Sequence, residues 1–371
     1  MRFRGKLASG AIALGFTVAM ASPGFAADVT KVKLAPNKHG TVADFQPMAK
    51  FCGTKPIKVA FSDGWGGNYW RHITRAEFEN EAAKCKNITE TRYTDGEGKP
   101  EKQIADIEAL IAQHFDVILV YPDAGPAIDK AEREATEAGI AVVTFGTGSP
   151  SDTYPGKIGR DYADRTTTDQ IVVGEQFARR LAKALHGKGN VLIFGGTPGN
   201  PQSTAQEVGW KSVFKKYPGI KVLENNWIVT NWDPALAQQK TAALIAKYPE
   251  IDGIYSETTG PIRAFLAAGK KVPYYIGQSL MDLSCLAADH HFEMVSMDAH
   301  TWMVRLALRK AVAAAEGINN LEPSIVTLRF TEDTTSKNPK LAVKCDKTMP
   351  MDSIPSARLT KAQQIKALGG K

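Results

Sequence analysis

The loop that follows the first apolar run of the chain gathers side chains suited to holding a small polar molecule. After the run at 57–62, a glycine-rich loop leads into a helical segment through Asn68, Trp70 and Arg71. Asn68 supplies an amide, Trp70 a flat apolar face and Arg71 a fork of N–H donors. This combination indicates a site for a polyhydroxylated ligand, whose ring stacks on the indole. The alternative is that Trp70 only packs the junction of helix and sheet.

Further amide, hydroxyl and aromatic side chains stand just after other predicted strands or one helical turn beyond. Ligands of doubly wound sheets bind beyond the carboxyl ends of the strands, so these residues are candidates for the same site. They are Tyr121, Asn200, Gln206, Trp232, Thr258 and Gln278. For any one of them, a role as helix N-cap or in a turn is the alternative. Asp233, just before Pro234, is interpreted as an N-cap and not as a ligand residue.

Motifs for catalysis, metal binding or phosphate binding are missing from the sequence. There is no G-x-S-x-G, no H-E-x-x-H, no C-x-x-C and no P-loop, and His290-His291 falls in a predicted turn. We therefore expect no enzyme activity, no metal site and no cofactor. A converging pair of acids for glycoside hydrolysis stays an alternative, because such a pair has no fixed spacing in sequence.

Short apolar runs alternate with amphipathic helical segments along the whole chain. The runs lie at 57–62, 116–121, 140–145, 190–195, 221–228, 251–256 and 272–277. Between them, segments such as 101–113 and 169–185 carry apolar residues at the helical period. The pattern predicts an α/β protein with two doubly wound parallel-sheet lobes, since 371 residues exceed one ordinary core. A composition of 43% hydrophobic and 23% charged residues excludes a disordered or coiled-coil chain.

Two C-terminal segments carry more specific expectations. Residues 302–316 predict a helix that packs through Val304 and Leu308 and leaves Arg305 and Arg309 in solvent. The tail at 344–371 is polar with weak helical character, and we expect it to lie as a strap over one lobe.

The first 26 residues have the pattern of a secretory signal peptide. Three basic residues precede a short uncharged apolar run, and small residues precede the expected cleavage after Ala26. An uncleaved anchor is the alternative, although the run is shorter than the ~20 residues of a membrane span. Removing this segment lowers the formal net charge from +7 to +4, which is too mild to indicate nucleic-acid binding. The mature protein is expected in the periplasm.

All four cysteines lie in the mature part of the chain. An even number in an oxidising compartment favours disulfides over metal ligation. Cys52 precedes the first strand and Cys85 ends the first helix, so that both lie on the same side of a βα unit. This favours the pairs Cys52–Cys85 and Cys285–Cys345 among three possible pairings, with free buried thiols as the alternative.

Taken in order along the chain, several segments resemble the type I periplasmic solute-binding proteins of the ribose/galactose group, which deliver sugars to ABC transporters. The resemblance covers about residues 55–331, and its segments are 67–71, 102–111, 116–122, 135–145 and 187–210. It implies a hinge of three chain segments. The chain is expected to pass from one lobe to the other at three crossings, near 160–161, 298–299 and 330–331. The implied N-terminal lobe is 55–160 with 299–330, and the implied C-terminal lobe and tail are 161–298 with 331–371.

The resemblance also implies which residues hold the ligand. Asn68 and Trp70 match the first-loop amide and aromatic that contact the sugar, and Trp232 matches the aromatic of the opposite lobe. Arg71 stands where a second aromatic residue is common in the family.

Asp161 and Asp298 fall at the first and second implied crossings and are included among the ligand residues. The chain departs from the family pattern elsewhere. It has Gly146-Thr147 where Asp-Arg is common and Gln206 where Arg is common. It also has Thr258-Thr259 where Asn-Asp is common, and Ser279 near a position where Asp is common. Losing charged groups that grip hydroxyls argues against ribose or galactose and in favour of another polyol, a modified sugar or a less polar ligand.

The sequence is thus interpreted as the substrate-binding component of an ABC importer. Two lobes close around a small sugar or polyol, and the closed form is recognised by a membrane permease. A monomer without nucleic-acid partners is expected. The alternatives are a secreted carbohydrate-active enzyme and a sensor that presents its ligand to a chemoreceptor.

Overall fold

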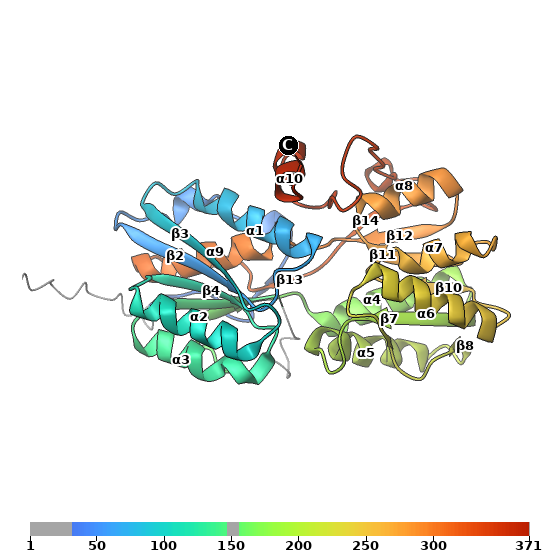
Figure 1. The fold of residues 1–371 in the computed structure, drawn as a ribbon, viewed down its shortest axis with the longest axis horizontal. Coiled ribbons are helices and arrows are strands. Elements are labelled where there is room, and N and C mark those ends of the chain that lie inside the picture. The colour runs from blue at the N-terminus through green and yellow to red at the C-terminus, as the bar shows by residue number, and fades with distance from the viewer. Residues whose placement is uncertain (1–31, 147–155, 371) are drawn as a thin grey trace, which may run out of the picture.

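The computed structural model describes residues 32–146 and 156–370, which form two α/β lobes lying side by side (Figure 1). The predicted signal peptide, residues 1–26, lies outside the described residues. Each lobe is built on its own sheet with helices on both faces, so the predicted fold class is confirmed.

The first lobe contains a five-stranded parallel sheet in the order β3-β2-β4-β5-β6. Its strands are β2 (Ile57–Asp63), β3 (Ile88–Asp95), β4 (Val117–Tyr121), β5 (Ala141–Phe145) and β6 (Asp164–Thr166). Every residue of β4 and β5 is buried, which explains their uninterrupted apolar sequences. Helices α2 (Pro100–Ala112) and α3 (Asp129–Glu137) cover one face, and α1 (Tyr69–Ala82) and α9 (Met303–Glu316) cover the other (Figure 1).

The second lobe is built on a sheet in the order β14-β12-β11-β10-β7-β8, with β9 paired to β7. Its strands are β7 (Lys188–Gly195), β8 (Gly219–Val222), β9 (Ile228–Val229), β10 (Gly253–Tyr255), β11 (Tyr274–Gln278), β12 (Met294–Met297) and β14 (Phe330–Asp333). All pairings are parallel except that of β14, which runs antiparallel to β12. Its helices are α4 (Gln170–Ala184), α5 (Pro201–Phe214), α6 (Pro234–Lys247), α7 (Gly260–Ala267) and α8 (Met281–His290).

Two of the three crossings between the lobes lie a few residues from their expected positions. β6 pairs with β5 in the first sheet, so the chain leaves the first lobe after Thr166 and not at 160–161. β13 (Ile325–Val326) pairs with β1 (His39–Gly40), whereas β14 already belongs to the second sheet. The third crossing is therefore 327–329 and not 330–331. In both cases a strand too short to stand out in the sequence decides where the lobe ends.

The C-terminal tail contacts both lobes, so the expectation that it covers only one is wrong. On the second lobe, the backbone N–H of Met281 donates to the carbonyl oxygen of Ser353 at 2.8 Å. On the first lobe, the backbone N–H of Arg358 donates to the Glu77 carboxylate at 2.6 Å. The tail then ends in α10 (Lys361–Ala367), which packs against α1 (Figure 1). The tail is thus a fourth segment that joins the lobes.

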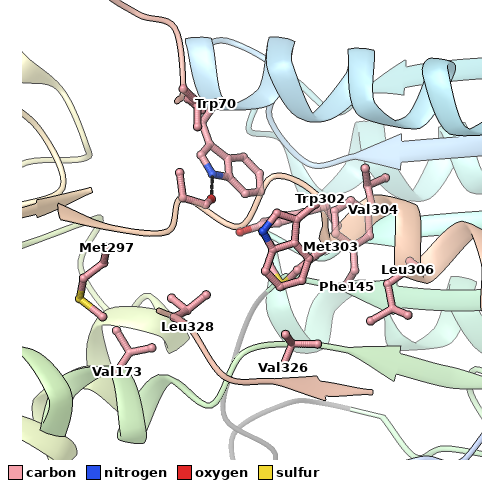
Figure 2. Packing of buried hydrophobic residues seen from close by; sticks show 14 of the residues in the cluster. Trp70, Phe145, Val173, Met297, Trp302, Met303, Val304, Leu306, Val326 and Leu328 are labelled. Atoms are coloured by element: carbon pink, nitrogen blue, oxygen red, sulfur yellow. Dashed lines mark hydrogen bonds between the residues drawn. The ribbon is translucent and has the colours of Figure 1, made fainter. Parts of the chain in front are cut away.

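Helix α9 is buried on nearly all sides. Trp302, just before the helix, and Val304 and Leu306 within it belong to a cluster that also contains Phe145 and Val326 (Figure 2). The same cluster continues across the crossings to other labelled residues on the second-lobe side, namely Met297, Leu328 and Val173.

The two arginines that were expected in solvent, Arg305 and Arg309, are 2% and 3% exposed. Arg305 pairs with Glu77 and Glu81, and Arg309 pairs with Glu81 at 2.8 Å and with Glu322 at 3.0 Å. The expectation failed because α1 and the tail cover the face of α9 that points away from the sheet.

The structure pairs Cys52 with Cys85 and Cys285 with Cys345, as predicted from the sequence. The second pair joins α8 to the start of the tail. Among residues 32–146 and 156–370, no helix is long and apolar enough to cross a membrane. Short 3-10 helices occur at Val42–Asp44, Met48–Lys50, Gly125–Ile128 and Pro339–Leu341.

Candidate ligand-binding site

A cavity lies between the two lobes at the carboxyl ends of their strands. The space between its walls, counted with the solvent at its open side, is about 530 Å³. Both lobes and the second crossing contribute its walls: Asn68, Tyr69, Trp70, Arg71, Tyr121, Asp123, Gln202, Trp232, Glu257, Gln278 and His300. Because parallel strands end at one edge of each sheet, loops distant in sequence converge there.

Trp70 belongs to the wall of the first lobe and contacts the second crossing. Asn68 caps α1, with its Oδ1 accepting from the Arg71 backbone N–H at 3.0 Å, and this places Trp70 at the second residue of the helix. The Trp70 indole Nε1 donates to the carbonyl oxygen of Ala299 at 2.7 Å (Figure 2). Its ring also makes edge contacts with Tyr121 and His300. The indole is therefore held in one orientation by groups of the first lobe and of the hinge.

Arg71 is held by carboxylates of its own lobe. One guanidinium nitrogen lies 2.8 Å from Asp63 and another lies 2.8 Å from Asp123, while the guanidinium stacks 3.5 Å from the centre of the Tyr121 ring. Burial raises the pKa of Asp63 to about 7 although Arg71 opposes the shift, and burial also raises the pKa of Asp123. Two guanidinium nitrogens of Arg71, which the sequence analysis assigned to the ligand, thus bind carboxylates of the protein instead.

Trp232 forms the facing wall in the second lobe, and Glu257 fixes it. The Trp232 indole N–H donates to Oε2 of Glu257. Oε1 of Glu257 accepts from the Gln202 amide at 2.9 Å and from the Tyr255 hydroxyl at 3.0 Å. The indole lies against Gly196, where an added Cβ would come within 2.3 Å of the ring. Trp232 itself has a left-handed φ of 54°, a strained conformation that suits a functional position.

Several neutral polar residues line the cavity wall. They include Gln278, with its side-chain amide, and Tyr69 and Tyr121, with their hydroxyls. The side chain of His300 also lines the cavity, and burial lowers its pKa, which keeps the imidazole neutral near pH 7. The wall therefore offers neutral donors and acceptors between two indoles, which suits hydroxyl groups.

Six of the predicted ligand residues line this cavity together: Asn68, Trp70, Arg71, Tyr121, Trp232 and Gln278. Two more, Gln206 and Asp298, line a smaller adjoining cavity that shares the Glu257 and His300 walls. Asp298 accepts from the Trp302 indole at 3.0 Å, so it braces the second crossing.

Three predicted residues lie outside both cavities. Asn200 caps α5, its Oδ1 accepting from the Gln202 backbone N–H at 2.9 Å. Thr258 is buried behind the wall, with its backbone N–H donating to Ser256. Asp161 is paired with Arg133 and Arg160 inside the first lobe. Its assignment to a crossing was wrong because β6 follows it.

Five wall residues were not among the predicted ligand residues: Tyr69, Asp123, Gln202, Glu257 and His300. Asp123 and Glu257 stand directly after predicted strand ends, and Tyr69 and Gln202 stand further on, where the next helix begins. Their positions after strands indicated the site, although their residue types did not. His300 lies in a crossing, where no strand end marks it. In the described part of the chain, no group of three His, Cys, Asp or Glu residues is arranged to hold a metal ion.

Comparison with known proteins identifies the family. The family model described as periplasmic binding protein domain matches residues 59–317. The chain is 27% identical over 193 residues to a xylitol-binding protein of Mycolicibacterium smegmatis, covering 51% of this chain and 52% of the relative. It is 28% identical over 180 residues to the D-xylose-binding periplasmic protein of Escherichia coli, covering 46% and 52%. The chain thus spans about half the length of these curated relatives.

Solved structures show the same fold at low identity. A galactofuranose-binding protein superposes with a TM-score of 0.64 at 21% identity, covering 74% of this chain and 94% of that one. An ABC transporter solute-binding protein of Agrobacterium vitis with bound allitol gives a TM-score of 0.61 at 22% identity, covering 75% and 96%. The family model covers well over half of the chain, and the two-lobed fold agrees with it. The chain therefore belongs to the periplasmic binding protein family.

Proposed function

We propose that this protein is the substrate-binding component of an ABC importer and captures a small sugar or polyol by closure of its two lobes. The observation that carries the proposal is a cavity walled by both lobes, to which the first lobe contributes Trp70 and the second lobe Trp232. A ligand that contacts both walls stabilises the closed form, and a permease that recognises this form receives the ligand. The relatives named for xylitol and xylose, and the allitol-bound structure, support this ligand class.

The proposal includes export through cleavage of residues 1–26 and action in the periplasm without a chemical step. The acids of the cavity support the absence of catalysis. Asp123 is bound by Arg71, and Glu257 is surrounded by neutral donors, so neither is arranged as a free general acid or base beside the other.

Thermal-shift measurements with pentoses, pentitols, hexoses and hexitols test the ligand class. A ligand at 100 times its dissociation constant adds ~2.7 kcal/mol to the free energy of unfolding and raises the melting temperature by about 5 °C. No shift with any of these compounds contradicts the proposal. Chemical conversion of a binding compound by the purified protein favours an enzyme instead.

Small-angle scattering tests closure. With a saturating ligand identified by thermal shift, the radius of gyration is expected to decrease, because the lobes rotate toward each other. Calorimetry on the same sample confirms saturation. An unchanged radius at saturation contradicts hinge closure and favours a rigid pocket.

A further inference from the structure

The charges around the cavity do not balance on the second lobe. The Glu257 carboxylate accepts hydrogen bonds from an indole, two amides and a phenol, all of them neutral. Among the described residues, no lysine or arginine forms an ion pair with it. The negative charge of a carboxylate at the wall of a partly enclosed cavity acts strongly on a bound ligand, because the low dielectric of the surroundings screens it only weakly.

The first lobe does not supply the missing positive charge. Arg71 is the one formal cation among the described residues that line the cavity, and it faces the two carboxylates of Asp63 and Asp123. His300 is buried and carries no charge near neutral pH. The cavity is therefore lined by two carboxyl groups, those of Asp123 and Glu257, and by one guanidinium, which is already paired with Asp123 and with Asp63 behind the wall.

We propose that the cavity selects polyhydroxylated ligands without negative charge, favours those that carry a protonated amine, and owes this preference to Glu257. The proposal rests on the sugar- or polyol-binding function proposed above and narrows its ligand class. A sugar acid or sugar phosphate would place its anion against Glu257 or Asp123 with no unpaired cation to receive it. A protonated amine would instead supply the missing charge.

Of the three carboxylates Asp63, Asp123 and Glu257, Glu257 alone has no cationic partner among the described residues. It also positions Trp232 and Gln202, so its removal is expected to weaken binding of every ligand to some degree. The two roles are separable, because loss of positioning lowers the affinity for charged and neutral ligands alike. Loss of the charge changes the ratio of their affinities.

Calorimetric titration with two matched sets of probes tests this selection. One set is xylitol, xylonate and 1-amino-1-deoxyxylitol, and the other is allitol, allonate and the corresponding amino compound. In the unmodified protein, the dissociation constant of each acid is expected to exceed that of its polyol by about tenfold or more, and the amine is expected to bind more tightly than the polyol.

The variant Glu257→Gln should lower the ratio of acid to polyol dissociation constants by about tenfold. Glu257→Asp keeps the charge and should keep the ratio, even where its shorter side chain weakens all binding. Glu134→Gln removes the same charge from α3, where Glu134 pairs with Lys130 and does not line the cavity, and should leave the ratio unchanged.

Acids that bind as tightly as their polyols, or a ratio unaffected by Glu257→Gln, overturn the selection while the proposed function stands. Amines that bind no better than polyols overturn the preference for a cation. Failure of all six compounds to bind overturns the selection as stated for polyols, and the proposed function falls with it only if the thermal-shift screen of sugars and polyols also gives no shift.

Discussion

The indole Nε1 of Trp70 donates a 2.7 Å hydrogen bond to the carbonyl oxygen of Ala299, which lies in the second crossing between the lobes. The backbone N–H of Ala299 donates in turn to Oγ of Ser356 in the tail, at 3.1 Å. A single hinge residue therefore joins an aromatic wall of the cavity to the strap that bridges the lobes. Trp70 is placed to respond both to ligand and to hinge movement.

Replacing Trp70 should affect ligand affinity and hinge stability separately. Trp70→Phe keeps an aromatic face but leaves the buried Ala299 carbonyl without its donor, which is expected to cost about 1–3 kcal/mol of unfolding free energy. Trp70→Ala also removes the face, and a loss of about 2–4 kcal/mol in binding is expected. Calorimetry with melting curves separates the two effects. Equal affinity in both folded variants and the unmodified protein would exclude Trp70 from ligand binding.

Trp232→Ala should weaken ligand binding with a smaller effect on stability. Trp232 is only half-buried, so the variant loses little packing, whereas a ligand loses a wall worth about 2–4 kcal/mol. Thr230→Ser, beside it but outside the lining of the cavity, is the matched control and should keep full affinity. Near-normal affinity in Trp232→Ala, together with the same result for Trp70→Ala, would rule out a ligand held between two indoles.

Removing the Cys285–Cys345 disulfide should release the start of the tail. The double variant Cys285→Ser and Cys345→Ser is expected to lose about 2–4 kcal/mol of unfolding free energy and to be cut by protease in the strap near 346–358 before the lobes unfold. The matched variant at Cys52 and Cys85 should leave the strap protected. Non-reducing peptide mapping of the exported protein checks the pairings, and four alkylatable thiols would contradict them.

Ionisation of Asp63 should lower the free energy of unfolding of the protein as the pH rises from about 5 to about 7.5. Burial raises the pKa of Asp63 to about 7, above its ordinary value of ~3.9, so the folded state holds a proton that unfolding releases in this window. The free energy of unfolding then falls with rising pH. The variant Asp63→Asn should lose this contribution, which appears as a difference in the slope of melting temperature against pH.

Asp346→Asn is the control for that slope, because the pKa of Asp346 is lowered to about 2 by Lys361 and the group stays ionised throughout the window. Its curve should run parallel to that of the unmodified protein. A parallel curve for Asp63→Asn as well would show that Asp63 does not titrate near neutrality.

The sequence determined the architecture and the first wall of the cavity. Uninterrupted apolar strands such as β4 and β5 occur where a parallel sheet is covered on both faces, so their pattern alone predicts the sheet. Asp233 caps α6 as predicted, and Asn68 and Trp70 lie on the cavity wall at the start of α1, because a helix N-terminus and a strand end are set by nearby residues. Both disulfide pairings also followed from positions along the chain.

Only the tertiary structure decided which charges meet. Arg305 and Glu81 are 224 residues apart, and no periodicity within α9 reveals that α1 and the tail will cover it. In the same way, the sequence indicated that the Arg71 guanidinium would be available to a ligand. In the structure it pairs with Asp63 and Asp123, which lie at the ends of two different strands. Glu257 holds the second-lobe wall in place because Gln202 of α5, Trp232 and Tyr255 all donate hydrogen bonds to it, and these residues come together only in the folded lobe. The physical reason is that periodicity along a segment reports its own inward face, whereas the partner of a buried polar group is supplied by whichever distant element packs against it.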